Sequence, residues 1–461
     1  MVSSDKDRGS KALPPLALGA FGAVIVIAAL LGGCGKKGQG TGEAKTAGAA
    51  KTAPNAVKTA GGEADKGTAA ATGAAAKAPA EVKKRQVLIW HAYRDAERAA
   101  LDKLIGAWNA KHPNVQVKAL AVPFDALVDK IQVAIPRGNG PDLVIFAHDK
   151  IGTWARDKLI QPLGKWATPA RLKRFLPQTI KPLVFERAIY GLPLAFKSLV
   201  LFYNKGLVQT PPATMKELVE VAKKHTDREE GRFGLAYDAA DLYFHAPFLH
   251  AYGGAVYDEK AGKLTIASEG AVAAAEAVRA LHADAKVLPK GMSGFVVTAM
   301  FSDNKVPFVL NGPWFISEID KGVKWGVAPL PTADNGQPLR PFLGSEAVLL
   351  SARTKVRDAA LRVLDYLTSD EAALTRLAEG RQMVANTRVY ENPRWSSDPV
   401  VKVFRAQADV SVPMSNAVEA GLAWQPYNNA LRRIIFGGAP AKETLQAAQA
   451  TADAALAKLK R

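Results

Sequence analysis

The folded part of the chain opens with two kinds of hydrophobic pattern that alternate. Uninterrupted apolar runs at 87–90 and 143–146 indicate strands buried on both faces, and apolar residues at every second position of 115–121 indicate a third strand. Between these strands, apolar residues recur at helical spacing over 101–108 and 124–135. The order strand, helix, strand, helix, strand is typical of a parallel sheet with right-handed crossover connections. The pattern therefore predicts an α/β fold.

Later segments of the chain repeat the two patterns. Buried strands are predicted at 199–203 and 306–310. The spacing of Thr214 and Glu217 predicts a capping box that begins a helix, and the same motif spans Thr368 to Glu371. Further helices are predicted over 268–282, 356–367, 424–435 and 442–461.

Polar side chains gather where one predicted strand ends. The run at 143–146 finishes in an aromatic residue, Phe146, and His148, Asp149 and Lys150 follow closely. In open α/β sheets, ligands bind beyond the carboxyl ends of the strands. This segment is therefore a candidate binding site, and the alternative is a core phenylalanine followed by an ordinary polar loop.

The N-terminal segment has the pattern of an export signal. Three basic residues among the first eleven precede sixteen apolar or small residues at 16–31, and Gly32-Gly33-Cys34 follows. This order predicts a secretory signal peptide over 1–33. The run Leu31-Gly32-Gly33-Cys34 resembles the bacterial lipoprotein box, which implies lipidation of Cys34 and a membrane anchor. An uncleaved membrane helix is the alternative.

The segment 34–85 is predicted to be a flexible linker. From Gly35 to about Ala80 it consists mainly of Ala, Gly, Thr and Lys, without aromatic residues. Such a composition cannot bury enough apolar surface to offset the conformational entropy lost on folding. We therefore expect a tether between the N-terminal signal and the folded body.

The net charge of +18 raises the question of a nucleic-acid partner. Seven of these charges fall within residues 1–85, which leaves +11 spread over the remaining 376 positions. Because no basic block or stripe stands out, we expect no nucleic-acid partner.

The chain lacks the usual sequence signatures of catalysis. It contains no phosphate-binding P-loop, no His-Glu-x-x-His and no Gly-x-Ser-x-Gly motif. Its single cysteine excludes an internal disulfide and a cysteine-based zinc site. Carboxylates such as Asp95, Glu97, Asp149 and Asp241 could be paired for glycoside hydrolysis, but acidic residues are common in the chain. We therefore expect a binding protein without a cofactor or metal.

A series of short motifs runs through the folded body. In chain order they are Val87-Leu88-Ile89-Trp90-His91, Gly140-Pro141-Asp142, Ala147-His148-Asp149, Tyr203-Asn204-Lys205, Asn311-Gly312-Pro313-Trp314 and Ala385-Asn386. With these motifs, the chain from about Lys84 to the C-terminus resembles the maltose/maltodextrin-binding proteins, which are the solute-binding components of carbohydrate ABC importers.

The resemblance implies a two-lobed periplasmic-binding-protein fold of type II. Two α/β lobes would be joined by three crossings of a hinge, with the ligand held in the cleft between them. The first lobe would comprise 86–196 and 345–395, and the second 197–344 and 396–461. A monomer that closes around its ligand would then dock on a membrane permease.

The resemblance also implies roles for individual residues. Asp149 and Lys150 would grip sugar hydroxyls, and Asp241 would be a further acidic contact. Asp95 would lie in the first loop that reaches the sugar, with Tyr93, Arg94 and Glu97 as competing candidates. Stacking faces for the sugar rings are expected from Phe146, Tyr243, Trp314 and Trp424.

Lys197 departs from the family pattern. It stands where the family commonly has a glutamate that accepts hydrogen bonds from sugar hydroxyls, and a lysine can only donate. The first expectation is an oligosaccharide, maltose or maltodextrin. Because Lys150 and Lys197 favour an anion, a charged solute such as a sugar phosphate remains an alternative, as do a polyamine and a secreted carbohydrate-active enzyme.

Overall fold

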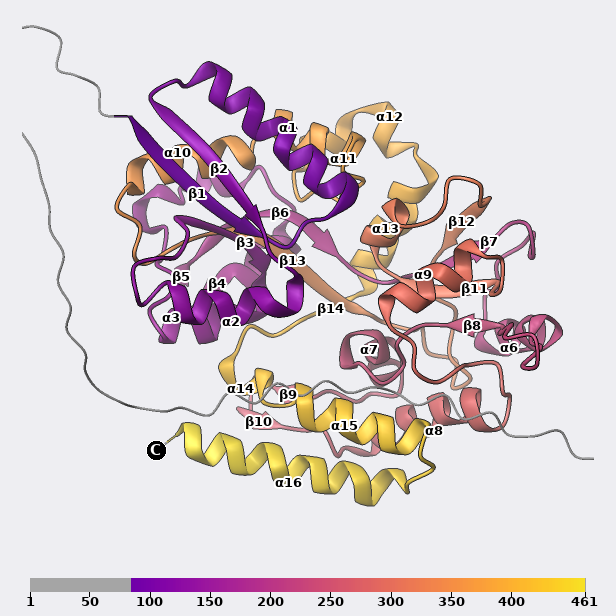
Figure 1. Cartoon of the computed structure of the whole chain (residues 1–461). Helices are drawn as coiled ribbons and strands as arrows, with labels where there is room; N and C mark the ends of the chain where they lie inside the picture. Colours follow the sequence, from indigo (N-terminus) through magenta and orange to yellow (C-terminus); the bar gives the residue numbers. More distant parts are fainter. Residues whose placement is uncertain (1–83, 461) are drawn as a thin grey trace, which may run out of the picture. The chain divides into compact units, whose positions relative to one another are not determined.

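The structure, a computed structural model, describes residues 84–460 and contains two separate mixed sheets (Figure 1). The first sheet consists of β1 (Arg85–His91), β2 (Val115–Ala121), β3 (Leu143–Ala147), β6 (Gly191–Lys197), β13 (Phe342–Leu350) and β14 (Val412–Pro413). Its order is β14-β13-β3-β1-β2, and β6 also pairs with β13. β1 is parallel to β2 and β3, whereas β13 runs antiparallel to β3 and β6.

Helices cover both faces of this first sheet, as the continuous apolar strands require. The helices α1 (Asp95–Lys111), α10 (Arg357–Leu367) and α11 (Asp370–Ala378) pack on one face (Figure 1). On the other face lie α2 (Phe124–Ala134) and α3 (Ile151–Arg156). Successive strand residues point to opposite faces, so Ile89 joins the first core cluster and Trp90 the second.

The second sheet has four strands and is also covered on both faces. It consists of β7 (Val200–Asn204), β8 (Leu235–Ala236), β11 (Phe308–Asn311) and β12 (Trp325–Ala328), in the order β12-β7-β11-β8. One side carries α6 (Met215–His225), α7 (Leu242–Ala251), α8 (Glu269–Ala283), α15 (Trp424–Ile435) and α16 (Ala441–Leu459). The other side carries α9 (Gly294–Ser302) and α13 (Pro399–Val410).

Short elements connect these layers. They are η1 (His148–Lys150), η2 (Gly164–Trp166), α4 (Pro169–Leu172), α5 (Pro177–Ile180), η3 (Lys181–Leu183), β4 (Val184–Phe185), β5 (Ala188–Ile189), β9 (Tyr257–Asp258), β10 (Lys263–Leu264), η4 (Pro313–Ser317), η5 (Arg388–Glu391), α12 (Pro393–Ser396) and α14 (Val418–Gly421).

The chain passes from the first sheet to the second between β6 and β7 and returns between β12 and β13. A third connection runs through β14, which pairs with β13 of the first sheet and lies in the chain between α13 and α15 of the second. Buried hydrogen bonds tie these segments together. The hydroxyls of Ser198 and Ser411 are 2.8 Å apart. The ring of His148 accepts from the Ser345 N–H at 3.0 Å through Nδ1 and donates to the Met414 carbonyl at 2.7 Å through Nε2. The predicted two-lobed α/β fold with a three-crossing hinge is confirmed.

The lobe boundaries stay a prediction. The predicted boundaries after 196 and after 344 fall inside β6 and β13, so the strands of the first sheet run through them. The predicted boundary at 395 falls within the short helix α12.

Most elements predicted from the sequence are present, and the two predicted capping boxes differ in outcome. Thr214 Oγ1 accepts from the Glu217 N–H, and Glu217 Oε2 accepts from the Thr214 N–H, each at 3.2 Å. The capping box predicted at Thr368 is wrong, because its hydroxyl donates to the Leu364 carbonyl of the preceding helix at 2.9 Å. Ser369 caps α11 instead.

The predicted signal peptide at 1–33, the predicted lipidation site Cys34 and nearly all of the predicted linker at 34–85 lie outside the described residues. Within 84–460, no helix combines the length and apolar character needed to cross a membrane.

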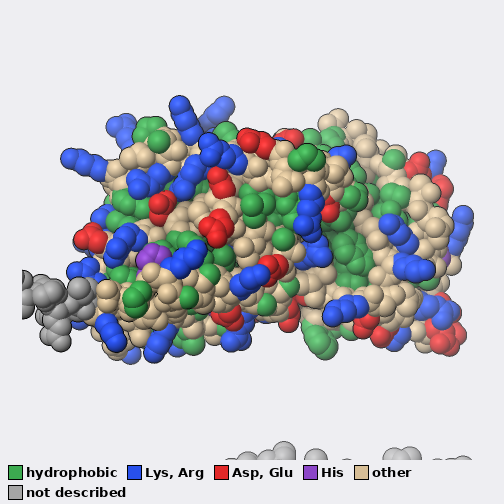
Figure 2. Space-filling view, turned by 90° about the horizontal axis from the view of Figure 1, so that it is seen from above, with side chains coloured by type: hydrophobic (Ala, Val, Ile, Leu, Met, Phe, Trp, Pro, Cys, Tyr) green, Lys and Arg blue, Asp and Glu red, His purple; other side chains and the backbone are tan. Residues whose placement is uncertain are grey.

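One face of the described part shows how its basic residues are distributed. On the face drawn in Figure 2, Lys and Arg side chains alternate with acidic and hydrophobic ones over the whole outline.

Candidate functional site

Four aromatic side chains from four different elements meet where the two sheets approach each other. Tyr243 lies near the start of α7, Trp314 in η4, Phe342 at the start of β13 and Trp424 at the start of α15. The ring centres of Tyr243 and Trp314 are 6.1 Å apart, those of Tyr243 and Phe342 6.4 Å, and those of Phe342 and Trp424 6.3 Å. We call these four residues the aromatic row.

The start of α7 is fixed in a way that positions Tyr243. Asp241 is the N-cap of α7 and accepts from the Tyr243 N–H at 2.9 Å. Asn428 of α15 donates to Asp241 Oδ2 at 3.1 Å and accepts from the Leu242 N–H at 2.8 Å. Burial raises the pKa of Asp241. Asp241 thus stands beside the aromatic row, where it caps a helix; its predicted sugar contact stays a prediction.

The hydroxyl of Tyr243 is buried and has no hydrogen-bond partner within residues 84–460. Burial raises the pKa of Tyr243, and Lys197, Asp241 and Asp149 are close enough to influence it. The hydroxyl is therefore a neutral donor at physiological pH. A buried polar atom of this kind usually has a partner, such as a ligand group or a water molecule.

A lysine held between two glutamates lies next to the aromatic row. Lys197 Nζ at the end of β6 is 3.0 Å from Glu346 Oε1 and 3.5 Å from Glu97 Oε1. Tyr93 Oη donates to Glu346 Oε2 at 2.6 Å. Lys197 Nζ also lies 5.7 Å from the ring centre of Trp314. We call Tyr93, Glu97, Lys197 and Glu346 the lysine–glutamate cluster.

One lysine faces two glutamates in this cluster. Burial by itself lowers the pKa of Lys197, but the charges of Glu346 and Glu97 outweigh it, so that the pKa lies above its ordinary value. Burial raises the pKa of Glu97, and the charge of Lys197 opposes this shift. Burial also raises the pKa of Tyr93. Lys197 therefore stays protonated at neutral pH, with its charge matched by carboxylates.

Asp149 and Lys150 form a second pair beside the site. Their charged groups are 2.8 Å apart in η1, directly after β3, and the Asp149 charge acts on Tyr243. The structure thus brings Asp149, Lys197, Asp241, Tyr243, Trp314 and Trp424 together around the aromatic row. Lys150 joins them through its ion pair with Asp149.

Phe146 does not offer the predicted stacking face. Its side chain is only 2% exposed and packs in the core with the ring of Trp154 at 5.2 Å. Phe124 stacks on it at 4.8 Å and is itself 58% exposed. The reason is the strand alternation, which points Phe146 toward α2 and α3. Phe146 is therefore a core residue.

Asp95 lies at the start of α1, directly after the loop between β1 and α1, and its predicted sugar contact stays a prediction. It is exposed, has a φ of 45°, and makes no side-chain hydrogen bond within the part of the chain that the structure describes. Two of the competing candidates, Tyr93 and Glu97, belong to the lysine–glutamate cluster.

Sequence reasoning missed two residues, Phe342 and Glu346, because it did not predict β13. A signal was present. The strand 342–350 is an apolar segment with one charged residue, Glu346, and all nine of its residues are buried. A single carboxylate within such a run indicates a partner, since buried charges are normally paired.

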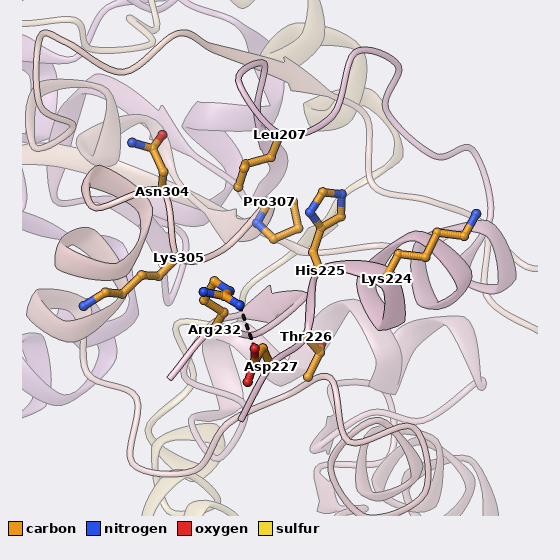
Figure 3. Close-up of a pocket in the computed structure, with 9 residues that line it drawn as sticks. All are labelled: Leu207, Lys224, His225, Thr226, Asp227, Arg232, Asn304, Lys305 and Pro307. Carbon is orange, nitrogen blue, oxygen red and sulfur yellow. Dashed lines mark hydrogen bonds and ion pairs between the residues drawn. The ribbon is translucent and has the colours of Figure 1, made fainter. Parts of the chain in front are cut away.

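Two cavities elsewhere do not involve the predicted site residues. One of about 310 Å³ is lined by Lys224, His225, Arg232 and Lys305 among others, and Asp227 pairs with Arg232 at 2.6 Å (Figure 3). Another of about 220 Å³ has Trp325 and Trp395 in its wall. Over residues 84–460, no group of His, Cys, Asp and Glu side chains is arranged to hold a metal ion.

Comparisons with known proteins identify the family. Residues 91–374 match the family described as "Bacterial extracellular solute-binding protein". The maltotriose-binding protein of Pyrococcus abyssi is 28% identical over 362 residues, which is 77% of this chain and 79% of that protein. The galactooligosaccharide-binding protein of Bacillus subtilis is 26% identical over 80% of this chain and 89% of its own length.

A solved structure gives the same result. The maltotriose-binding protein of Thermus thermophilus, bound with maltotriose, superposes with a TM-score of 0.74 at 27% identity, over 80% of this chain and all of that one. The resemblance predicted from the sequence is confirmed. The chain belongs to the bacterial extracellular solute-binding proteins.

Proposed function

We propose that this protein captures a neutral oligosaccharide, with maltodextrins as the first candidates, and delivers it to the permease of an ABC importer. The observation that carries the proposal is the aromatic row beside the lysine–glutamate cluster. Aromatic rings pack against the C–H faces of sugars, and polar groups at the ring edges bond to hydroxyls. The relatives named for maltotriose and galactooligosaccharides support this ligand class.

The buried hydroxyl of Tyr243 adds a specific reason to expect a polar ligand group. It lies within the aromatic row and has no partner in the part of the chain described. A sugar hydroxyl bound there would accept its hydrogen bond. A purely apolar ligand would leave it unsatisfied, at a cost of about 1–3 kcal/mol.

The pairing of the lysines argues against an anionic ligand. Lys197 is matched by Glu97 and Glu346, and Lys150 by Asp149. An anion bound beside these lysines would have to compete with carboxylates that are already in contact. The two lysines that favoured a sugar phosphate as the ligand therefore no longer support that alternative.

The same pairing argues against glycoside hydrolysis. Glu346 is bonded through both oxygens to Tyr93 and Lys197, and Asp149 is paired with Lys150. These carboxylates serve as partners of neighbouring side chains, which supports binding without turnover. We accordingly propose that the protein is not an enzyme.

The proposed mode of action is closure of the two lobes on the ligand. The lobes would comprise 86–196 with 345–395, and 197–344 with 396–461. Asp149, Lys150, Lys197, Asp241, Tyr243, Trp314 and Trp424 would contact the sugar, together with Tyr93, Glu97 and Phe342. By its preference for the closed form, the ligand would shift the equilibrium between open and closed forms. We further propose export as a monomer anchored to the membrane through Cys34.

A thermal-shift screen tests the proposal. The panel contains maltose, maltotriose, longer maltodextrins, a galactooligosaccharide, a sugar phosphate and a polyamine. We expect stabilisation by at least one neutral oligosaccharide and none by the sugar phosphate or polyamine. Stabilisation by a charged solute alone would overturn the proposal, and chromatographic detection of maltotriose cleavage would overturn the claim of binding without catalysis.

A further inference from the structure

The lysine–glutamate cluster contains more polar groups than its own ion pairs require. We propose that Lys197 and Glu97 together form a donor–acceptor pair for one edge of a sugar ring, and that Glu346 is the positioning residue that holds Lys197 in place. This inference rests on the proposed function, because it assigns a ligand group to the same site. It predicts selection for a sugar with a free hydroxyl at that edge.

The donor side of the pair is Lys197. An ammonium group has three N–H donors, and the two glutamates account for two of them, at 3.0 and 3.5 Å. One donor therefore remains. Nζ lies 5.7 Å from the ring centre of Trp314 and 5.9 Å from that of Tyr93, so a ring packed on Trp314 has its edge near this donor.

The acceptor side is Glu97. Its Oε1 accepts from Gln382 Nε2 at 3.2 Å and faces Lys197, while Oε2 makes no hydrogen bond within residues 84–460. A sugar hydroxyl both accepts and donates, so it can accept from Lys197 and donate to Glu97. Hydrogen bonds to charged groups are stronger than those between neutral groups.

Glu346 has a different role, because both of its oxygens are occupied. Oε1 faces Lys197 at 3.0 Å, and Oε2 accepts from the Tyr93 hydroxyl at 2.6 Å. It lies on β13 two residues from Gly344, which is the strand partner of Lys197 on β6. The paired strands thus hold the carboxylate beside the ammonium.

Several charged or titratable groups surround Lys197 and define how it responds to pH. They are Glu97 on α1, Glu346 on β13, Tyr93 in the loop before α1 and Tyr243 on α7. The charges of Tyr93 and Glu346 also act on the buried Arg376 of α11. Only the two glutamates offset the effect of burial on the ammonium to a large degree. Removing either charge therefore makes Lys197 easier to deprotonate.

The first test is a calorimetric titration with maltotriose at pH 7. We expect Lys197→Met, Glu97→Gln and Glu346→Gln each to weaken binding about tenfold or more. The matched control is Lys205→Met, since Lys205 Nζ also lies 5.9 Å from a tyrosine ring, that of Tyr203, outside the cluster. Its affinity should equal that of the wild type.

The second test separates positioning from a merely structural effect. Glu346→Gln should weaken binding about tenfold in the wild-type background and add little further loss to Lys197→Met, because Glu346 then has no ammonium group to hold. An equal further loss in the Lys197→Met background would overturn the positioning role. Should Glu346→Gln not fold, Glu346→Asp carries the same test, since it keeps the charge and shortens its reach toward Lys197.

The outcomes distinguish this inference from the proposed function. Wild-type protein that binds no neutral oligosaccharide refutes the proposed function. Wild-type protein that binds maltotriose, with Lys197→Met and Glu97→Gln binding equally well, leaves the proposed function intact and refutes the donor–acceptor pair.

Discussion

At the scale of single residues, the site combines side chains whose hydrogen bonds are complete with one whose hydroxyl is unpaired. Asp241 and Asn428 satisfy each other and the start of α7. The Tyr243 hydroxyl beside them has no partner within residues 84–460. Sites that bind ligands often carry such groups at a cost to the stability of the free protein.

Tyr243→Phe is expected to separate stability from binding. Removing an unpaired buried hydroxyl should raise the free energy of unfolding of the ligand-free protein by about 1 kcal/mol, or leave it unchanged. Sugar affinity should fall about tenfold, because the variant lacks the hydroxyl that donates a hydrogen bond to the sugar. Thermal unfolding and calorimetric titration measure the two effects.

The control for this prediction is Tyr427→Phe. The Tyr427 hydroxyl is also buried and unpaired in the described part of the chain, but it lies in the core beside His245. We expect the same effect on stability and none on affinity. A Tyr243→Phe protein that is less stable and binds sugar normally would show that the hydroxyl has no role in the site.

His245 gives a prediction about acid stability. It is fully buried on α7, and burial lowers its pKa to about 3. A histidine in the unfolded chain has a pKa near 6.5. Between about pH 6.5 and 3, the unfolded chain therefore binds a proton at this residue and the folded chain does not. This residue's stabilising effect is thus complete above about pH 6.5 and declines as the pH falls toward 3.

Denaturant unfolding between pH 7 and pH 5 measures this effect. Wild type should lose about 2 kcal/mol more stability over that interval than His245→Gln, at about 1.4 kcal/mol per pH unit below 6.5. His225→Gln, at the end of α6, is the control and should follow the wild type. Parallel pH profiles for all three proteins would refute the assignment.

At the scale of elements, the sequence predicted the features whose residues lie close together in the chain and not the contacts between distant segments. Helices such as α1, α8 and α15 follow from apolar spacing within one segment. Lys197 and Glu346 meet only because β6 pairs with β13, which lies far away in the sequence. No local pattern contains that register, so the role of Lys197 in an ion-pair cluster could not be predicted.

The burial of Phe146 and the exposure of Asp95 have similarly local reasons. An uninterrupted apolar strand does not reveal which residues face the site, and Phe146 faces α2 and α3. At the start of α1, Asp95 and Glu97 differ by two positions, or about 200° around the helix. Asp95 and Glu97 therefore point in nearly opposite directions, and the sequence alone does not show which of the two carboxylates faces the site.

The start of α11 offers a direct test of helix capping. Ser369 Oγ accepts from the Ala372 N–H at 3.2 Å, and Thr368 is bonded to the helix before it. Ser369→Ala should lower the free energy of unfolding by about 1 kcal/mol. Glu371→Ala should have little effect, whereas a capping box at Thr368 would make Glu371 important and Ser369 dispensable. Denaturant unfolding of both variants decides between these possibilities.

At the scale of the whole molecule, two kinds of contact join elements of the first sheet's layers to elements of the second sheet's layers. Arg94, before α1, pairs with Glu318, after η4, and Thr298 of α9 also donates to Glu318 at 3.0 Å. Because Arg94 is exposed, such a pair contributes about 0–1 kcal/mol. The aromatic row and the lysine–glutamate cluster are less exposed and adjoin each other, so a ligand bound between them would dominate the closure of the lobes.

The most direct test of the account is a calorimetric titration of the wild-type protein and Trp314→Ala with maltotriose. We predict saturable binding of one ligand per wild-type chain, weakened at least tenfold in Trp314→Ala. Maltotriose should be recovered intact. An absence of saturable binding by the wild type to maltotriose, longer maltodextrins and galactooligosaccharides, or equal affinity of the two proteins, would contradict the account.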